Sequence, residues 1–226
     1  MKNFTLILAL LVAALTANAQ TGKELKKQGD EAYKSKNYPK AVLDYSRAIE
    51  AYKSEGTTDT SIFYNATIAA YKARDYEKII PFSQKAIELG HDKSHLCYYI
   101  QALAHDKQGN DDAYFATLIK GHKAHPGYSK IGDKLAVAYL KKGTEPYNEA
   151  ANIIKEAEQY RESDTDKYMA ELERANKKFK EALESFEKAY EANAEEKQVL
   201  NLLLSVYKNL EMKSKANKIN SELQSL

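Results

Sequence analysis

The chain has 226 residues, with 34 lysines and arginines against 32 aspartates and glutamates, and its formal net charge of +2 excludes the strong basic field of a nucleic-acid-binding protein. A single cysteine, Cys97, excludes an intramolecular disulfide, and we expect it to be buried as a small apolar residue. Only nine glycines are present, and apolar residues recur at spacings of three and four, which predicts an all-α fold.

The first 19 residues form a segment of their own. Lys2 precedes an apolar run from Phe4 to Leu15, and Ala17-Asn18-Ala19 offers the small residues that a signal peptidase accepts. A transmembrane anchor is the alternative, but the run is shorter than the roughly 20 apolar residues that span a bilayer. We therefore predict a cleaved signal peptide over 1–19 and an exported chain over 20–226, periplasmic or secreted, without a stable membrane anchor.

A pattern of four positions recurs along the rest of the chain. Gly29, Ala41, Tyr45 and Ala48 are separated by steps of 12, 4 and 3 residues, and these steps return at intervals near 34 residues. Small residues let paired helices approach closely, and an aromatic ring fills the space between them. The later copies are Thr67, Ile79, Ser83, Ala86; Ala102, Tyr114, Leu118, Gly121; Ala170, Ala182, Phe186, Ala189; more faintly Leu204, Ala216, Asn220, Leu223; and, with two residues inserted near Pro146, Ala136, Ala150, Ile154, Ala157.

An aromatic residue also precedes the second position of the pattern by three, as in Tyr38-Pro39-Lys40-Ala41 and Phe179-Lys180-Glu181-Ala182. On these residues the chain resembles the tetratricopeptide repeat family, whose repeats are antiparallel helix pairs stacked into a superhelical solenoid. The resemblance implies about six repeats, the last of them divergent enough to be a cap. Their approximate bounds are 22–55, 60–93, 95–128, 129–162, 163–196 and 197–226, with turns inside the first four at Lys36-Asn37, Arg74-Asp75, Gly109-Asn110 and Gly143-Thr144.

The segment from Asp164 to Ala194 has two interpretations. It contains no glycine or proline and is rich in alanine, glutamate, lysine and leucine, so it could form one long helix. The repeat pattern favours two helices with a turn near Asn176-Lys177-Lys178 instead. A continuous helix would need a partner for its apolar face, and a homo-oligomer is one way to supply it. That face consists of Tyr168, Leu172, Phe179, Leu183 and Phe186.

In the family that this chain resembles, the first helices of successive repeats line a concave groove that binds extended peptides or a helix of a partner protein. Tyrosine suits such a surface because it offers wide, rigid contact area and a hydroxyl group, although most of the 17 tyrosines could instead pack between helices. The groove candidates are Lys26, Tyr33, Tyr64, Asn65, Tyr71, Tyr99, Leu103 and Lys134.

One subclass of the family holds the terminal carboxylate of a peptide with a clamp of lysine, arginine and asparagine. Lys26 and Asn65 match that clamp, but Asp30 replaces an asparagine, and Leu96 and Ile100 stand where cations are required. Because Asp30 would repel a carboxylate, we do not expect this kind of recognition.

All five histidines lie between residues 91 and 125. Antiparallel pairing would bring His91, His95, His122 and His125 to one edge, so a metal-binding protein or an accessory subunit of an envelope enzyme is the alternative function. No recognised metal-ligand motif is present, and His91 and His125 stand beside turn residues, so we predict no metal site or cofactor. Phosphate-binding loops and nucleophile motifs are also missing from the sequence, and we predict a protein-binding scaffold that is not an enzyme.

Overall fold

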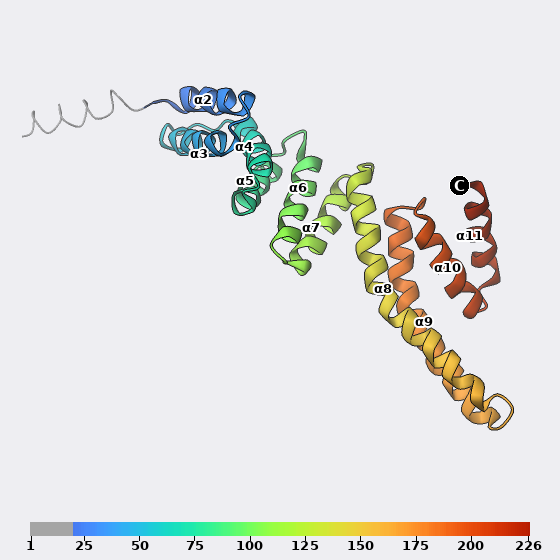
Figure 1. Ribbon diagram of the computed structural model, residues 1–226. Helices are drawn as coiled ribbons and strands as arrows, with labels where there is room; N and C mark the ends of the chain where they lie inside the picture. The colour runs from blue at the N-terminus through green and yellow to red at the C-terminus, as the bar shows by residue number, and fades with distance from the viewer. Residues whose placement is uncertain (1–19) are drawn as a thin grey trace, which may run out of the picture. The chain divides into compact units, whose positions relative to one another are not determined.

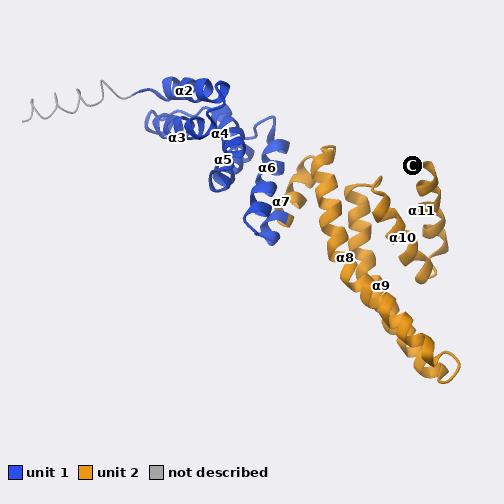
Figure 2. Cartoon of the chain, viewed as in Figure 1, with its two compact units in different colours: residues 1–114 blue, residues 115–226 orange. Residues whose placement is uncertain are grey.

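The structure, a computed structural model, describes residues 20–226, and the predicted signal peptide over 1–19 lies outside the described residues. Within this range the chain forms α-helices and one short 3₁₀-helix, with no strand, as the sequence predicts. It divides into two compact units, of which the N-terminal unit ends at Tyr114 and the C-terminal unit begins at Phe115 (Figure 2). None of the described helices is both long and apolar enough to cross a membrane.

In the N-terminal unit, helices pack against their neighbours in the sequence (Figure 1). Polar caps start them: Thr21 forms a capping box with Glu24, and Asn37, Asp59 and Asp75 accept bonds from the first backbone N–H groups of the helices that follow. The helices are α2 (Gly22–Lys34), α3 (Tyr38–Ser54), α4 (Thr60–Ala73), α5 (Tyr76–Glu88) and α6 (Ser94–Lys107), while α7 (Asp111–Ala124) spans the boundary between the units.

The first three predicted turns are present. Lys36 and Arg74 end their helices with left-handed backbone, at φ of 61° and 60°, and Gly109 does the same at 71°. This conformation lets the last carbonyl groups of a helix find donors, and it favours glycine because a Cβ atom is crowded there.

The pattern of small and aromatic residues forms the contact between paired helices. Ala41 and Ala48 are fully buried, and Tyr45 is 2% exposed. The ring of Tyr45 packs directly on Gly29 of α2. This contact requires glycine, because a Cβ atom at position 29 would lie 2.6 Å from the ring. The structure therefore confirms the packing role that the spacing predicts.

The C-terminal unit departs from the predicted repeats. Two long helices, α8 (Ser129–Ala157) and α9 (Thr165–Ala192), pack side by side as a hairpin joined through η1 (Glu158–Tyr160), and the far end of this hairpin extends beyond α10 (Lys197–Asn209) and α11 (Lys213–Ser225) (Figure 1). The predicted helix pairs 129–162 and 163–196 are therefore wrong, because each of these segments is dominated by one continuous helix. The turns expected at Gly143-Thr144 and Asn176-Lys177-Lys178 lie inside α8 and α9.

Gly143 lies inside α8 at a close contact between the two long helices, not in a turn. A Cβ atom on Gly143 would lie 2.5 Å from the ring of Phe186, which is fully buried. Phe179, Leu183 and Phe186 are all covered within the unit, so this part of the α9 face does not require a second copy of the chain. Tyr168 and Leu172, nearer the tip, are only partly buried.

The first half of α8 and the second half of α9 together form one regular helix pair. Ala136 occupies the first position of the pattern and Ala182 the second, yet they are 46 residues apart instead of the 12 that separate Gly29 from Ala41. The additional 34 residues, 145–178, form the projecting part of the hairpin, which we call the arm. Ala150, Ile153 and Ala175 are buried inside it.

Candidate functional site

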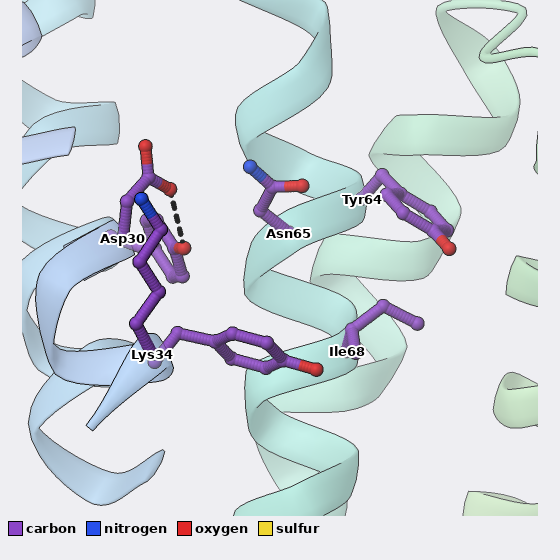
Figure 3. A pocket seen from close by; sticks show the side chains of 7 residues that line it. Asp30, Lys34, Tyr64, Asn65 and Ile68 are labelled. Carbon is purple, nitrogen blue, oxygen red and sulfur yellow. Dashed lines mark hydrogen bonds between the residues drawn. The ribbon is translucent and has the colours of Figure 1, made fainter. Parts of the chain in front are cut away.

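A pocket of about 260 Å³ opens between α2 and α4 in the N-terminal unit, and we call it the first pocket. Its lining includes Tyr33, Tyr64 and Asn65, three of the predicted groove residues. Figure 3 shows Asp30 and Lys34 on α2 opposite Asn65 on α4, with Tyr64 on the side of α4 that points away from α2. The lining residues are Asp30, Tyr33, Lys34, Tyr45, Tyr64, Asn65 and Ile68.

Contacts inside and outside the first pocket hold its aromatic side chains in place. Tyr64 stacks on His91 with ring centroids 4.6 Å apart, and Tyr33 packs edge-to-face on Tyr38 at 5.5 Å. The Tyr45 hydroxyl donates a hydrogen bond of 2.7 Å to the Asp30 carboxylate (Figure 3). Burial and this bond raise the pKa of Tyr45, so its hydroxyl stays protonated and Asp30 is held by an internal donor.

Lys26 does not line the first pocket. Its ammonium group pairs with Asp59 and donates a 2.8 Å hydrogen bond to the Ser61 hydroxyl, which ties α2 to the start of α4. Burial by itself would raise the pKa of Asp59, but the hydrogen bonds from Lys26 and Ser61 outweigh it, and the pKa lies below its ordinary value. This role could not be predicted from local sequence, because Asp59 lies 33 residues after Lys26, at the N-cap of α4.

A second pocket, of about 280 Å³, lies where α4 ends, α5 begins and α6 passes. It contains Tyr71 and Leu103, two further predicted groove residues, and Tyr71 is 38% exposed. Tyr76 and three cationic side chains, none of them among the predicted groove residues, complete the lining. The second pocket consists of Tyr71, Lys72, Arg74, Tyr76, Leu103 and Lys107.

The remaining two candidates lie outside both pockets. Tyr99 is partly buried and packs against the hydrophobic core of the N-terminal unit. Lys134 is exposed on α8 in the C-terminal unit.

An open cleft of about 620 Å³ lies in the C-terminal unit, between α9 and the turn from α10 to α11. The cleft could not be predicted from local sequence, because its lining combines residues of α8, α9 and the turn from α10 to α11. The cleft is lined by Ile154, Leu172, Asn176, Lys180, Leu183, Asn209, Leu210, Glu211 and Met212.

The histidines are the candidate metal ligands of the sequence. Among residues 20–226, no group of three or more histidine, cysteine, aspartate or glutamate side chains is placed to hold a metal ion. His91 and His95 belong to the N-terminal unit, His122 and His125 to the C-terminal unit, and His91 supports Tyr64 by stacking. This arrangement gives the metal-binding alternative no support.

Cys97 is fully buried, as the sequence predicts, and burial raises the pKa of its thiol to about 12. Since the thiolate is the reactive form, this residue does not act as a nucleophile near neutral pH.

Comparison with known proteins identifies the fold. No protein-family profile matches the chain, and no curated protein has a matching sequence. Among solved structures, a TPR repeats protein from Bacteroides fragilis superposes with a TM-score of 0.60 at 23% identity, covering 83% of this chain and 98% of that one. The MamA protein superposes with a TM-score of 0.50 at 13% identity over 90% of each chain. The chain therefore has the tetratricopeptide-repeat fold, with a helical arm inserted into its fourth helix pair.

Proposed function

We propose that this chain is an exported scaffold that binds an extended segment of a protein partner in the groove between the first helices of its N-terminal repeats. The observation that carries the proposal is the first pocket, which is lined by Tyr33, Tyr64 and Asn65. Tyrosines that are already fixed lose little conformational entropy on binding, and rigid aromatic side chains supply much of the energy at protein interfaces.

The size of the pockets favours side chains of a peptide over a whole small molecule. The first and second pockets measure about 260 and 280 Å³. Sites for drug-sized ligands and cofactors span roughly 300–1,000 Å³. Two small pockets, each lined by residues of α4, suit two separate side chains of one extended segment.

The groove is tested by selecting peptides from a random display library on residues 20–226 and measuring their affinity by fluorescence anisotropy. Tyr64→Ala and Tyr33→Ala should each weaken the selected peptides about tenfold or more, because each removes an aromatic wall. Tyr168→Ala, which removes a half-exposed tyrosine of the arm, is the matched control and should bind like the unmodified chain. Circular dichroism checks that helicity is retained, and full affinity in both groove variants would refute the proposal.

Export is a separate part of the proposal and depends on the sequence of residues 1–19. We expect the chain expressed with this segment to be recovered outside the cytoplasm with Gln20 as its first residue, measured by intact mass. Full-length chain confined to the cytoplasm would contradict it.

A further inference from the structure

The second pocket is lined by cations without a carboxylate among them. Lys72, Arg74 and Lys107 contribute three positive charges, beside Tyr71, Tyr76 and Leu103. None of the three cations forms an ion pair with another residue in the described part of the chain. Other lysines of this unit, by contrast, pair with an acid three or four residues away. The pocket thus combines an apolar floor with an unbalanced positive charge.

Lysine recurs in register on the first helices. Lys34, Lys72, Lys107 and Lys141 each stand five residues after the first position of the repeat pattern, held by Gly29, Thr67, Ala102 and Ala136. In the N-terminal unit, Lys34 lines the first pocket, and Lys72 and Lys107 line the second. The same helical face therefore presents a cation in successive repeats.

The preference for cations at helix C-termini explains only some of these lysines. Cations are favoured in the last turn of a helix because they face its carbonyl groups, and Lys34, Lys72 and Lys107 occupy such positions. Lys141, however, lies in the middle of α8, which continues to Ala157. Arg74 follows the end of α4 and lines the same pocket with left-handed backbone.

We infer that the second pocket binds an aspartate or glutamate side chain of the partner segment, so that the groove selects acidic peptides. This inference rests on the proposed function and adds the chemical class of the partner. Arginine and lysine make charge-assisted hydrogen bonds to a carboxylate, and the two tyrosines and Leu103 reduce its exposure to water, which strengthens the attraction.

The two pockets also set a spacing in the peptide. Asn65 and Ile68 of α4 line the first pocket and Lys72 the second, along one face of the helix at three- and four-residue steps. Seven residues of α-helix, from Tyr64 to Tyr71 or Asn65 to Lys72, rise about 10 Å. An extended peptide covers that distance in about three residues. The acidic residue should therefore lie about three positions from the side chain that fills the first pocket.

The test uses the peptides selected from the random library on residues 20–226. We expect enrichment of aspartate and glutamate at a fixed spacing from an aromatic or apolar residue, and an affinity that falls as salt rises. The triple variant K72Q/R74Q/K107Q should weaken these peptides at least tenfold, and replacing the peptide's acids by their amides should have the same effect. K23Q/K27Q/K78Q removes the same charge from exposed positions outside both pockets and should change affinity little.

The outcomes separate this inference from the proposed function. Peptides that lose binding in Tyr64→Ala but show no acidic enrichment, or that bind K72Q/R74Q/K107Q and the unmodified chain equally, would overturn the acidic specificity and leave the groove standing. Equal losses in the two triple variants would overturn it as well, because the effect would then be one of net charge. A library that yields no peptide dependent on Tyr33 or Tyr64 would overturn both.

Discussion

Gly143→Ala tests whether α8 is continuous and packed against α9, since helix propensity and packing act in opposite directions there. Alanine is favoured over glycine inside a helix by about 1 kcal/mol. The new methyl group would lie 2.5 Å from the ring of Phe186, which is fully buried and also contacts Tyr147. Overfilling a packed core typically costs about 1–3 kcal/mol. With about 2 kcal/mol for the clash, the variant should be less stable by about 1 kcal/mol.

Shortening the opposing side chain should make Gly143→Ala stabilising instead of destabilising. In a Phe186→Ala background the ring is gone and only Ser185 Cβ, at 3.1 Å, remains close to the new methyl group, so the helix propensity dominates and Gly143→Ala should stabilise by about 1 kcal/mol. The coupling between the two positions is then about 2 kcal/mol, far above the roughly 0.3–0.5 kcal/mol scatter of independent sites.

Urea unfolding followed by circular dichroism measures these free energies for the four chains of the cycle, and each 1 kcal/mol corresponds to about 2–4 °C in Tm for a chain of this size. Glu145→Ala, at an exposed neighbouring position, should stay within about 0.5 kcal/mol. If Gly143→Ala stabilises the unmodified chain and shows no coupling to Phe186, the packing argument fails.

Three further predictions concern the arm, a turn and an ion pair. Deleting 145–178 joins Thr144 to Phe179 and restores the 12-residue step of a regular repeat, so the shortened chain should still unfold cooperatively with high helicity; a molten chain by near-ultraviolet dichroism would contradict this. Lys36→Gly should stabilise by about 0.5–1 kcal/mol in urea unfolding, because the residue has left-handed backbone, and a loss of stability would count against that strain. The pKa of Asp59 is lower in the folded chain than in the unfolded chain, where it is 3.8. The ionised carboxylate therefore stabilises the fold above pH 3.8, and this stabilisation is lost as the pH falls through the pKa of the folded state. In Asp59→Asn the free energy of unfolding should accordingly fall less steeply below pH 4 than in the unmodified chain. An unchanged dependence on pH would refute the role of the Lys26 pair.

The candidate site was partly readable from the sequence. The repeat register placed Tyr33, Tyr64 and Asn65 on first helices, and the structure brings them to one pocket. The lysines five residues after each first pattern position were equally visible, but only the structure shows that Lys72 and Lys107 meet Arg74 in a pocket without carboxylates. Lys26 could not be assigned from local sequence, because its partner Asp59 lies 33 residues away, at the N-cap of α4.

The sequence by itself determined the helical class, the paired repeats and the turns at Lys36, Arg74 and Gly109, because spacing of small residues and turn chemistry act over short distances along the chain. Only the tertiary structure decided whether Gly143 and Thr144 form a turn or continue the helix. They stand seven and eight residues after Ala136, as Lys36 and Asn37 do after Gly29. A local turn preference is worth about 1 kcal/mol. Ala150, Ile153, Ala157 and Ala175 of the arm are buried, which requires α8 to continue past Gly143 and to lie along α9, and burying Ile153 alone is worth about 1.5–3 kcal/mol. Because this long-range packing stabilises the chain more than a local turn would, the same residues that would end a helix in a regular repeat continue it here.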